Sequence, residues 1–540
     1  MNEFIGRRPV LAGATASGLL LLARPAGAME LDPPCGPVRG VATDGVSAFL
    51  GLPYAAPPVG LLRYASPRPA LRWAERRDCA QAGAAAVQTF GGGAAWLYEP
   101  AQPQGEDCLF LNVWTPDPRG RHPVMVWLHG GAWRAGRGNA AGTVGAALAR
   151  DGEVVVVTVN YRLGALGWLA HPALADGETG AFANWGLQDQ VMALRWVKAN
   201  IAAFGGDPDN VTLFGQSAGG SSTASIAQDG RNAGLLHKAI IKSGSLHGAP
   251  GFPEVATAAA YAETLARRLD VTVPGLRSLP AMALHAAELQ LARDPAMVRS
   301  LGRPPVLPVL DGIVLKSWPR DGDLPAIPLL IGTTRTEATF WYDLVGPDGQ
   351  PIPGLQPPAD RAQLAGMVRD LTAIYRPEAA GLPPERIVDA YAAAARGRGE
   401  PESPLALWLA AYTDIVFRLR ARAAAARHAA AGHAAYLYEF ARPLAPPAHG
   451  VPHSSEIPFV FGTYADPFFA RKVGAGPDAA ALSASMLRAW AGFAHAGTPG
   501  AGWAAAAGPA LAVNVLGGPQ GADAVDTALR VEELAVWDAG

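Results

Sequence analysis

Residues 210–220 read NVTLFGQSAGG, and this stretch decides the fold of the 540-residue chain. The apolar run 210–214 predicts a buried strand, and the glycines on either side of Ser217 predict a sharp turn from that strand into a helix. A side chain at Gly215 or Gly219 would collide with the neighbouring strand or helix. The pattern therefore predicts Ser217 at the apex of a strand–turn–helix motif; the alternative is a Gly/Ser-rich loop that only caps a helix.

The segments around this motif alternate between apolar runs and helical periodicity. Apolar runs at 123–128 and 153–161 predict strands covered on both faces, and a helix is expected from 184 to 200. This order predicts an α/β protein whose mostly parallel central sheet is flanked by helices. Further strands are expected at 237–243, 329–333 and 434–440, large helical insertions at 254–300 and 360–433, and a closing helix at 482–496.

Composition narrows the class of protein. Half of the residues are hydrophobic, so the chain can bury a large core. The net charge is -2 and the pI is near 6.6, so the protein has no overall positive electrostatic field that would attract nucleic acid. The Gly-rich stretch 91–93 is not followed by the Gly-Lys-Ser/Thr of a phosphate-binding loop. We expect no nucleic-acid partner, no metal and no cofactor. Three cysteines, Cys35, Cys79 and Cys108, allow at most one disulfide.

The first 28 residues have the pattern of an export signal. Arg7 and Arg8 precede an apolar run from 10 to 23 that is too short to span a bilayer, and Ala-Gly-Ala at 26–28 is a small-residue cleavage pattern. The arginine pair fits a twin-arginine signal only loosely, so the export route stays open. We expect a periplasmic or secreted protein with no stable membrane insertion, in which 29–540 form one catalytic domain.

A serine hydroxyl is a weak nucleophile, so it needs a histidine base that is oriented by a carboxylate. After a strand–turn–helix serine, the expected chain order is serine, acid, histidine. His453 stands in a loop after the strand 434–440, with His449 as its nearest rival. Glu337 follows the apolar strand 329–331, at the strand end where parallel sheets place their sites. Asp311 is the competing acid, but Asp311-Gly312 is more typical of a turn.

An oxyanion that develops during attack by serine needs backbone N–H donors. Gly130 and Gly131 follow a buried strand and allow a close approach of the main chain to a substrate, and the amide after the serine belongs to Ala218. His129 directly precedes this glycine turn and is interpreted as structural.

These motifs resemble the type-B carboxylesterases, the α/β-hydrolase family that also holds the cholinesterases and bacterial para-nitrobenzyl esterases. Besides the serine motif, the resemblance rests on FLGLPYAAPP at 49–58, EDCL at 106–109, NYR at 160–162, FGGDP at 204–208 and the run 453–462. It implies an α/β-hydrolase fold and hydrolysis of a small-molecule carboxylic ester through an acyl-enzyme. It also implies the triad Ser217, Glu337 and His453, the oxyanion donors Gly131, Ala132 and Ala218, and a substrate pocket with Trp96, Phe340 and Trp341.

Two departures from that family pattern bear on function. The usual partner of the cysteine in EDCL would lie near 86–88, where there is none, so the common loop disulfide is in doubt; Cys79 is a displaced substitute. Gln216 stands where many relatives carry glutamate, which predicts a preference for neutral over cationic esters, although Glu456 is expected to retain some negative potential.

A lipase, an amidase or a binding relative without catalysis are the alternatives to an esterase, and the oligomeric state stays open.

Overall fold

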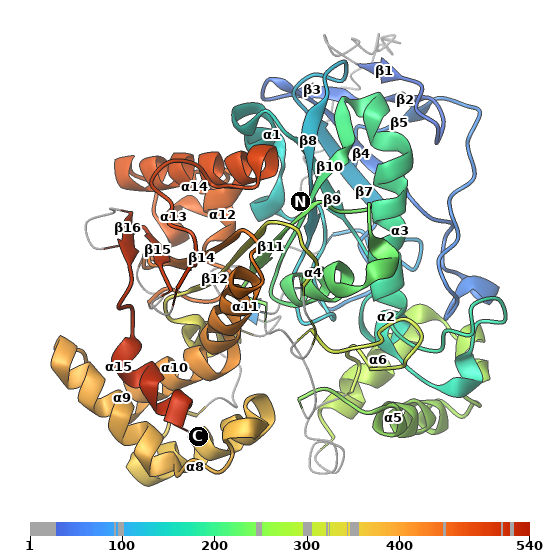
Figure 1. Ribbon diagram of the computed structural model, residues 1–540. Helices are drawn as coiled ribbons and strands as arrows, with labels where there is room; N and C mark the ends of the chain where they lie inside the picture. Colours follow the sequence, from blue (N-terminus) through green and yellow to red (C-terminus); the bar gives the residue numbers. More distant parts are fainter. Residues whose placement is uncertain are drawn as a thin grey trace, which may run out of the picture.

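The computed structural model describes residues 29–90, 93–94, 102–244, 251–294, 305–319, 322, 324–342, 344–345, 356–445, 450–508, 511–518 and 523–539. The expected export signal, Trp96 and His449 lie outside these residues. Figure 1 shows a twisted central sheet with helices on both of its faces and a further group of helices at one end.

The central sheet has eleven strands in the order β16-β15-β14-β12-β11-β10-β8-β9-β7-β4-β3. The seven neighbouring strands from β15 to β9 in this order pair in parallel. At the two edges, β16 pairs with β15, and β7, β4 and β3 pair with their neighbours, in antiparallel. The strands are β3 Val41–Thr43, β4 Val46–Pro53, β7 Phe110–Thr115, β8 His122–Leu128, β9 Val155–Val159, β10 Gly206–Gln216, β11 Lys238–Lys242, β12 Leu329–Thr334, β14 Ala435–Phe440, β15 Val513–Leu516 and β16 Ala524–Asp526. Short strands β1 Glu30–Leu31, β2 Val38–Arg39 and β5 Arg77–Asp78 form a second sheet, and β6 Gly93–Ala94 pairs with β13 Leu344–Val345.

Alternate side chains of the central strands enter two separate cores, because successive side chains of a strand point to opposite faces. Val126 and Leu213 belong to one core, with α2 (Gly164–Trp168) and α3 (Trp185–Asn200). Trp127 and Phe214 belong to the other core, with α1 (Ala146–Gly152), α12 (Ile457–Val460) and α14 (Pro477–Ala496). This burial on both faces explains why the central strands read as continuous apolar runs.

The helices on the two faces are short to medium in length. They are α1 Ala146–Gly152, α2 Gly164–Trp168, α3 Trp185–Asn200, α4 Ala218–Gln228, α5 Val255–Arg268, α6 Ala281–Ala292, α12 Ile457–Val460, α13 Ala470–Val473 and α14 Pro477–Ala496. No helix within the described ranges has the length and apolar character needed to cross a membrane.

A separate helical group follows β12 and has its own core (Figure 1). It consists of α8 Arg361–Tyr375, α9 Pro384–Arg398, α10 Pro404–Thr413, a π-helical segment Asp414–Arg418 and the C-terminal α15 Val531–Leu534. Helix α11 Leu419–Ala430 continues from the π-helical segment and packs against strands β12 and β14 of the central sheet. The expected mostly parallel sheet with large helical insertions is therefore confirmed. Several boundaries differ from the sequence prediction: β10 begins at Gly206 instead of 210, α14 begins at Pro477 instead of 482, and the described part of 254–300 contains two helices separated by a 3₁₀ turn, Pro274–Ser278.

Candidate active site

Ser217 lies at the turn between β10 and α4, as the glycine pattern predicts. Its φ of 58° and ψ of -123° are strained for a residue with a side chain. A Cβ at Gly215 would overlap the backbone of Gly219, and a Cβ at Gly219 would overlap the carbonyl of Leu128 on β8. Only glycine fits at these two positions, and the tight turn they allow presents Ser217 at the end of the parallel strands.

The N-terminal end of α4 supplies backbone amides beside the serine. The amide of Ser217 itself donates to the carbonyl of Lys242 on the adjacent strand β11, at 2.9 Å. Ala218 is the first residue of α4, so its N–H has no acceptor within the helix and lies at the positive end of the helix dipole. This amide can therefore donate to an anionic oxygen in front of Ser217.

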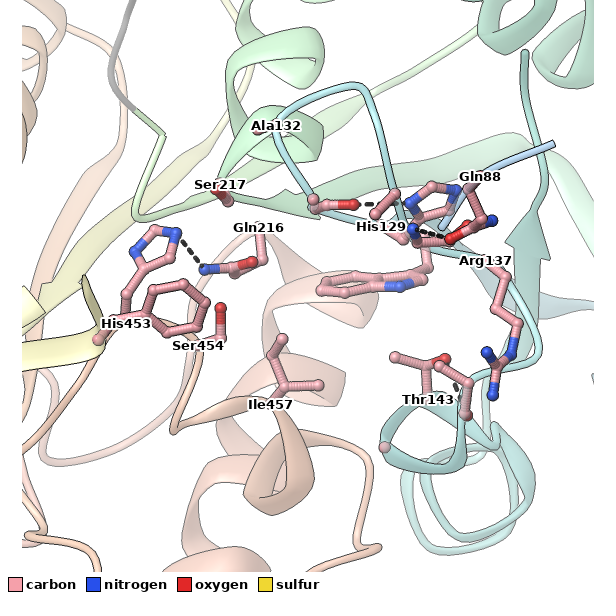
Figure 2. A pocket seen from close by; sticks show the side chains of 18 of the residues that line it. Gln88, His129, Ala132, Arg137, Thr143, Gln216, Ser217, His453, Ser454 and Ile457 are labelled. Atoms are coloured by element: carbon pink, nitrogen blue, oxygen red, sulfur yellow. Dashed lines mark hydrogen bonds between the residues drawn. The ribbon is translucent and has the colours of Figure 1, made fainter. Parts of the chain in front are cut away.

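His453 and Glu337, which are 116 residues apart in sequence, meet at a distance of 2.6 Å between Nδ1 and Oε2. Both side chains are buried, and the other carboxylate oxygen of Glu337 accepts from the backbone amide of Thr334 at 2.8 Å. Glu337 is thus fixed at both oxygens. The His453 ring lines the same cavity as Ser217, and its Nε2 is directed toward Gln216, at 3.1 Å from the amide nitrogen (Figure 2).

The loop after β8 has the left-handed backbone conformations that the glycine turn implies. Gly131 has a φ of 109° and Ala132 a φ of 54°. The side chain of Gln88 holds this loop, because its Nε2 donates to the carbonyl of Gly136 at 2.9 Å and its Oε1 accepts from the amide of Gly136 at 2.8 Å. Figure 2 places Ala132 and Ser217 on the same side of the cavity. Gly131, Ala132 and Ser217 line the same cavity, and Ala218 directly follows Ser217.

His129 is part of the wall of this site. Its ring stacks on Tyr161 with 4.2 Å between the centroids, and its Nδ1 lies 2.8 Å from the Gly130 carbonyl. Burial lowers the pKa of His129 to about 4, so the ring is neutral above that pH. A ring held in this way packs the loop and carries no charge at neutral pH.

Ser217 and His453 open onto a cavity of about 320 Å³. Phe340 and Trp341 line it, as the resemblance implied, with ring centroids 5.6 and 5.4 Å from that of His453. Phe417, which the sequence did not single out, lies 5.1 Å from the same ring. It belongs to the π-helical segment, and such segments often occur at functional sites. Three aromatic rings thus hold the histidine in place.

Two other aromatic rings of the cavity wall already face cations of the protein. The guanidinium of Arg137 lies 5.4 Å from the ring centroid of Phe90, and Nζ of Lys242 lies 5.3 Å from that of Trp127. Lys242 Nζ is also 3.4 Å from a carboxylate oxygen of Glu456, and both side chains are buried. Glu456 is therefore paired with a lysine that the sequence did not single out; burial lowers the pKa of this lysine, and the nearby carboxylate of Glu456 raises it.

The remaining candidate residues have other surroundings. Asp311 accepts three backbone N–H groups, from Ile313, Val314 and Leu315, which is the turn that the sequence favoured. Cys35, Cys79 and Cys108 are all free thiols, and burial raises the pKa of Cys35 and of Cys79 to about 12. Within the described ranges, no three His, Cys, Asp or Glu side chains gather as metal ligands.

Sequence reasoning missed Gln88, Arg137, Phe417 and Lys242 at this site. Gln88 and Phe417 lie in segments without a catalytic motif, and their roles come from contacts across the fold. Arg137 stands in the glycine-rich loop after His129, where a large cationic side chain is a signal that could have been noticed. A lysine at the end of an otherwise apolar run, as at Lys242, is the second such signal.

Comparisons with known proteins agree with this architecture. A family model described as "Carboxylesterase family" matches residues 28–521. The chain is 34% identical over 474 residues to para-nitrobenzyl esterase of Bacillus subtilis (strain 168), covering 86% of this chain and 89% of that protein. It is 33% identical over 483 residues to acylcarnitine hydrolase of Mus musculus, with 84% and 80% covered. A solved structure of a PNB esterase superposes with a TM-score of 0.77 at 31% identity, covering 94% of this chain and 99% of that chain.

Proposed function

This chain belongs to the carboxylesterase family and is a carboxylic ester hydrolase with an α/β-hydrolase fold, and we propose that it acts through a Ser217–His453–Glu337 triad and an acyl-enzyme intermediate. The observation that carries the proposal is the 2.6 Å contact between His453 Nδ1 and Glu337 Oε2, made beside Ser217 in one cavity. Residues from three separate segments of the chain meet there.

The proposed first step is attack by Ser217 Oγ on the ester carbonyl carbon. His453 Nε2 takes the hydroxyl proton as the C–O bond forms, and Glu337 stabilises the imidazolium through Nδ1–H. The tetrahedral intermediate collapses when His453 returns the proton to the alcohol oxygen, which leaves with the electron pair of the broken C–O bond. Water then attacks the acyl-enzyme by the same route and releases the acid and Ser217.

The amides of Gly131, Ala132 and Ala218 are proposed as the donors to the oxyanion. The strained conformations of Ser217 and Ala132 support this role, because both residues line the cavity and such strain persists only where surrounding contacts maintain it. The two hydrogen bonds between Gln88 and Gly136 keep the loop in this conformation before substrate binds, so the loop needs little reorganisation during the reaction.

The substrate is a small-molecule ester, and Phe340 and Trp341 are proposed as walls of its pocket. Trp96 is proposed to contribute as well, on the resemblance alone. We also propose that 29–540 act as one catalytic domain and that residues 1–28 direct export to the periplasm or the medium. The basis for both is the sequence pattern.

Lipase or amidase activity at the same site is the second candidate. Turnover of soluble short esters against amides and emulsified esters separates these activities, and we expect the soluble esters to be hydrolysed fastest. A binding relative without catalysis is the third candidate; the intact Ser217, Glu337 and His453 argue against it.

The test of the triad is the Ser217→Ala variant. We expect it to lose ester hydrolysis by about a million-fold while it keeps the melting temperature of the wild type. An organophosphonate probe should label the wild type at Ser217 and leave the variant unlabelled. Labelling of Ser217→Ala at the wild-type rate would show that another serine is the nucleophile.

A further inference from the structure

Lys242 and Glu456 form a buried ion pair between the segments that carry Ser217 and His453. Lys242 is the last residue of β11 and is fully buried, and Glu456 lies three residues after His453 and is also fully buried. Lys242 Nζ is 3.4 Å from Glu456 Oε1 and lies over the rings of Trp127 and Trp490, at 5.3 and 5.9 Å. The pair is therefore enclosed by aromatic rings of the core between β8, β11 and α14.

Stability alone does not account for such a pair. Removing two charges from water is expensive, and an apolar pair of the same size in a core is often as stable or more stable. Lys242 and Ile240 point to the same face of β11, where Ile240 packs in the apolar core. A methionine or leucine at 242 would fill the space, so the retained pair points to a role in the site.

The pair connects the two segments that carry the serine and the histidine. The carbonyl of Lys242 accepts from the amide of Ser217 at 2.9 Å, and Lys242 pairs in register with Gln216. Its side chain reaches Glu456, at the N-terminus of α12 and on the same short loop as His453. Main chain and side chain of one residue thus fix the nucleophile turn and the histidine loop relative to each other.

We propose that Lys242 and Glu456 are positioning residues of the esterase site, which hold His453 against Ser217 while their opposite charges leave no net charge behind the histidine. The proposal rests on the triad proposed above. Glu456 without Lys242 would place an uncompensated anion near the imidazole and favour its protonated form. Lys242 without Glu456 would place an uncompensated cation there and favour the neutral form.

The other ionisable groups around His453 would not compensate for the loss of either Lys242 or Glu456. Burial raises the pKa of Tyr438 on β14 and lowers that of His129, so both are neutral near pH 7. Glu337 contacts the imidazole directly, and Arg137 lies on the cavity wall over Phe90. Glu439 points to the opposite face of β14, where it pairs with Arg335 and Arg418. For Lys242 itself, burial lowers the pKa, whereas the adjacent carboxylate of Glu456 raises it and favours the charged amine.

The experiment measures kcat and KM for phenyl acetate from pH 5 to 9 in three variants. We expect Lys242→Met to move the midpoint of the kcat/KM profile to higher pH, and Glu456→Gln to move it to lower pH, each by about half a unit or more. The double variant should return to the wild-type midpoint, because no net charge remains. Its kcat on the pH plateau should still be reduced about tenfold or more with little change in KM, because the connection is lost.

A matched control removes a buried charge elsewhere. Glu533→Gln breaks the fully buried end of an ion pair with Arg398 and Arg530 on the helical group, so it should lower the melting temperature without moving the pH midpoint. If both single variants keep the wild-type midpoint or shift it in one direction, or if the double variant keeps the full kcat, the proposal is wrong. The double variant keeps the test decisive even if a single variant fails to fold. Labelling of Ser217 in the wild type tests the triad independently of these results.

Discussion

The side-chain amide nitrogen of Gln216 lies 3.1 Å from Nε2 of His453, the ring nitrogen that would receive the proton of Ser217. Since Nδ1 contacts the carboxylate of Glu337, the geometry fits a neutral ring that donates from Nδ1 and accepts at Nε2. A carboxylate in the place of this amide would accept a hydrogen bond from a protonated Nε2 and would favour the imidazolium. Gln216 therefore bears on the protonation state of the proposed base.

Gln216→Glu should move the midpoint of the kcat/KM profile to higher pH. A carboxylate next to Nε2 stabilises the protonated ring by a charge-assisted hydrogen bond, and about 1.4 kcal/mol of such stabilisation corresponds to one pH unit. We expect a shift of about one unit or more. The control Gln216→Met removes the amide without adding charge and should shift the midpoint much less; equal shifts in the two variants would contradict this account.

His453→Ala should abolish activity, and wild-type activity should rise with pH through a single group near neutrality. The base must be neutral to accept the proton, and an ordinary histidine titrates near pH 6.5. The comparison variant is His449→Ala, which we expect to keep most of its turnover. The opposite result, with His449→Ala inactive and His453→Ala active, would assign the base to His449.

The enzyme should prefer neutral esters to choline esters. Gln216 carries no charge, Glu456 is balanced by Lys242, and the rings of Phe90 and Trp127 already face Arg137 and Lys242. A cation over a free aromatic ring gains about 0.5 to 2 kcal/mol, while a nearby anion contributes about 1 to 4 kcal/mol. The measurement is kcat/KM for a choline ester against its uncharged isostere of the same shape.

A choline ester favoured tenfold or more would contradict the charge argument. Gln216→Glu should shift the ratio of the two kcat/KM values toward the choline ester, because it adds an anion beside the proposed nucleophile. Measuring both substrates above the pH midpoint of each variant separates this effect from the change in protonation of the base.

Stability should fall between pH 6.5 and pH 4 because of His129. Burial lowers the pKa of this ring to about 4, against about 6.5 in the unfolded chain, so the unfolded state binds one more proton between these values. The free energy of unfolding therefore rises with pH across this window, by about 3 kcal/mol from this residue, and falls on acidification.

The test is urea unfolding of the wild type and His129→Phe at several pH values from 4 to 7. Phenylalanine keeps the stacking on Tyr161 but cannot bind a proton, so the unfolding free energy of the wild type minus that of the variant should decrease as the pH falls. A difference that stays constant over the whole range would show that His129 does not titrate in this way.

The sequence by itself determined the α/β class with its mostly parallel sheet and the identity of the proposed nucleophile. Continuous apolar runs such as 123–128 and 153–161 specify strands buried on both faces, and the glycines around Ser217 specify a turn that no other residue can make. These signals are local, because they depend on side-chain period and backbone conformation within a few residues. For the same reason Glu337 and His453 could be placed at strand ends but not shown to meet.

Only the tertiary structure decided which groups surround these residues. The contacts of Glu337 with His453, Lys242 with Glu456 and Gln88 with Gly136 join residues 116, 214 and 48 positions apart. No local pattern encodes such pairs, because their distance is set by how the strands stack and where the loops return. The charge around the proposed catalytic histidine follows from these contacts, since Lys242 and Glu456 balance each other only once β11 and the histidine loop have packed together.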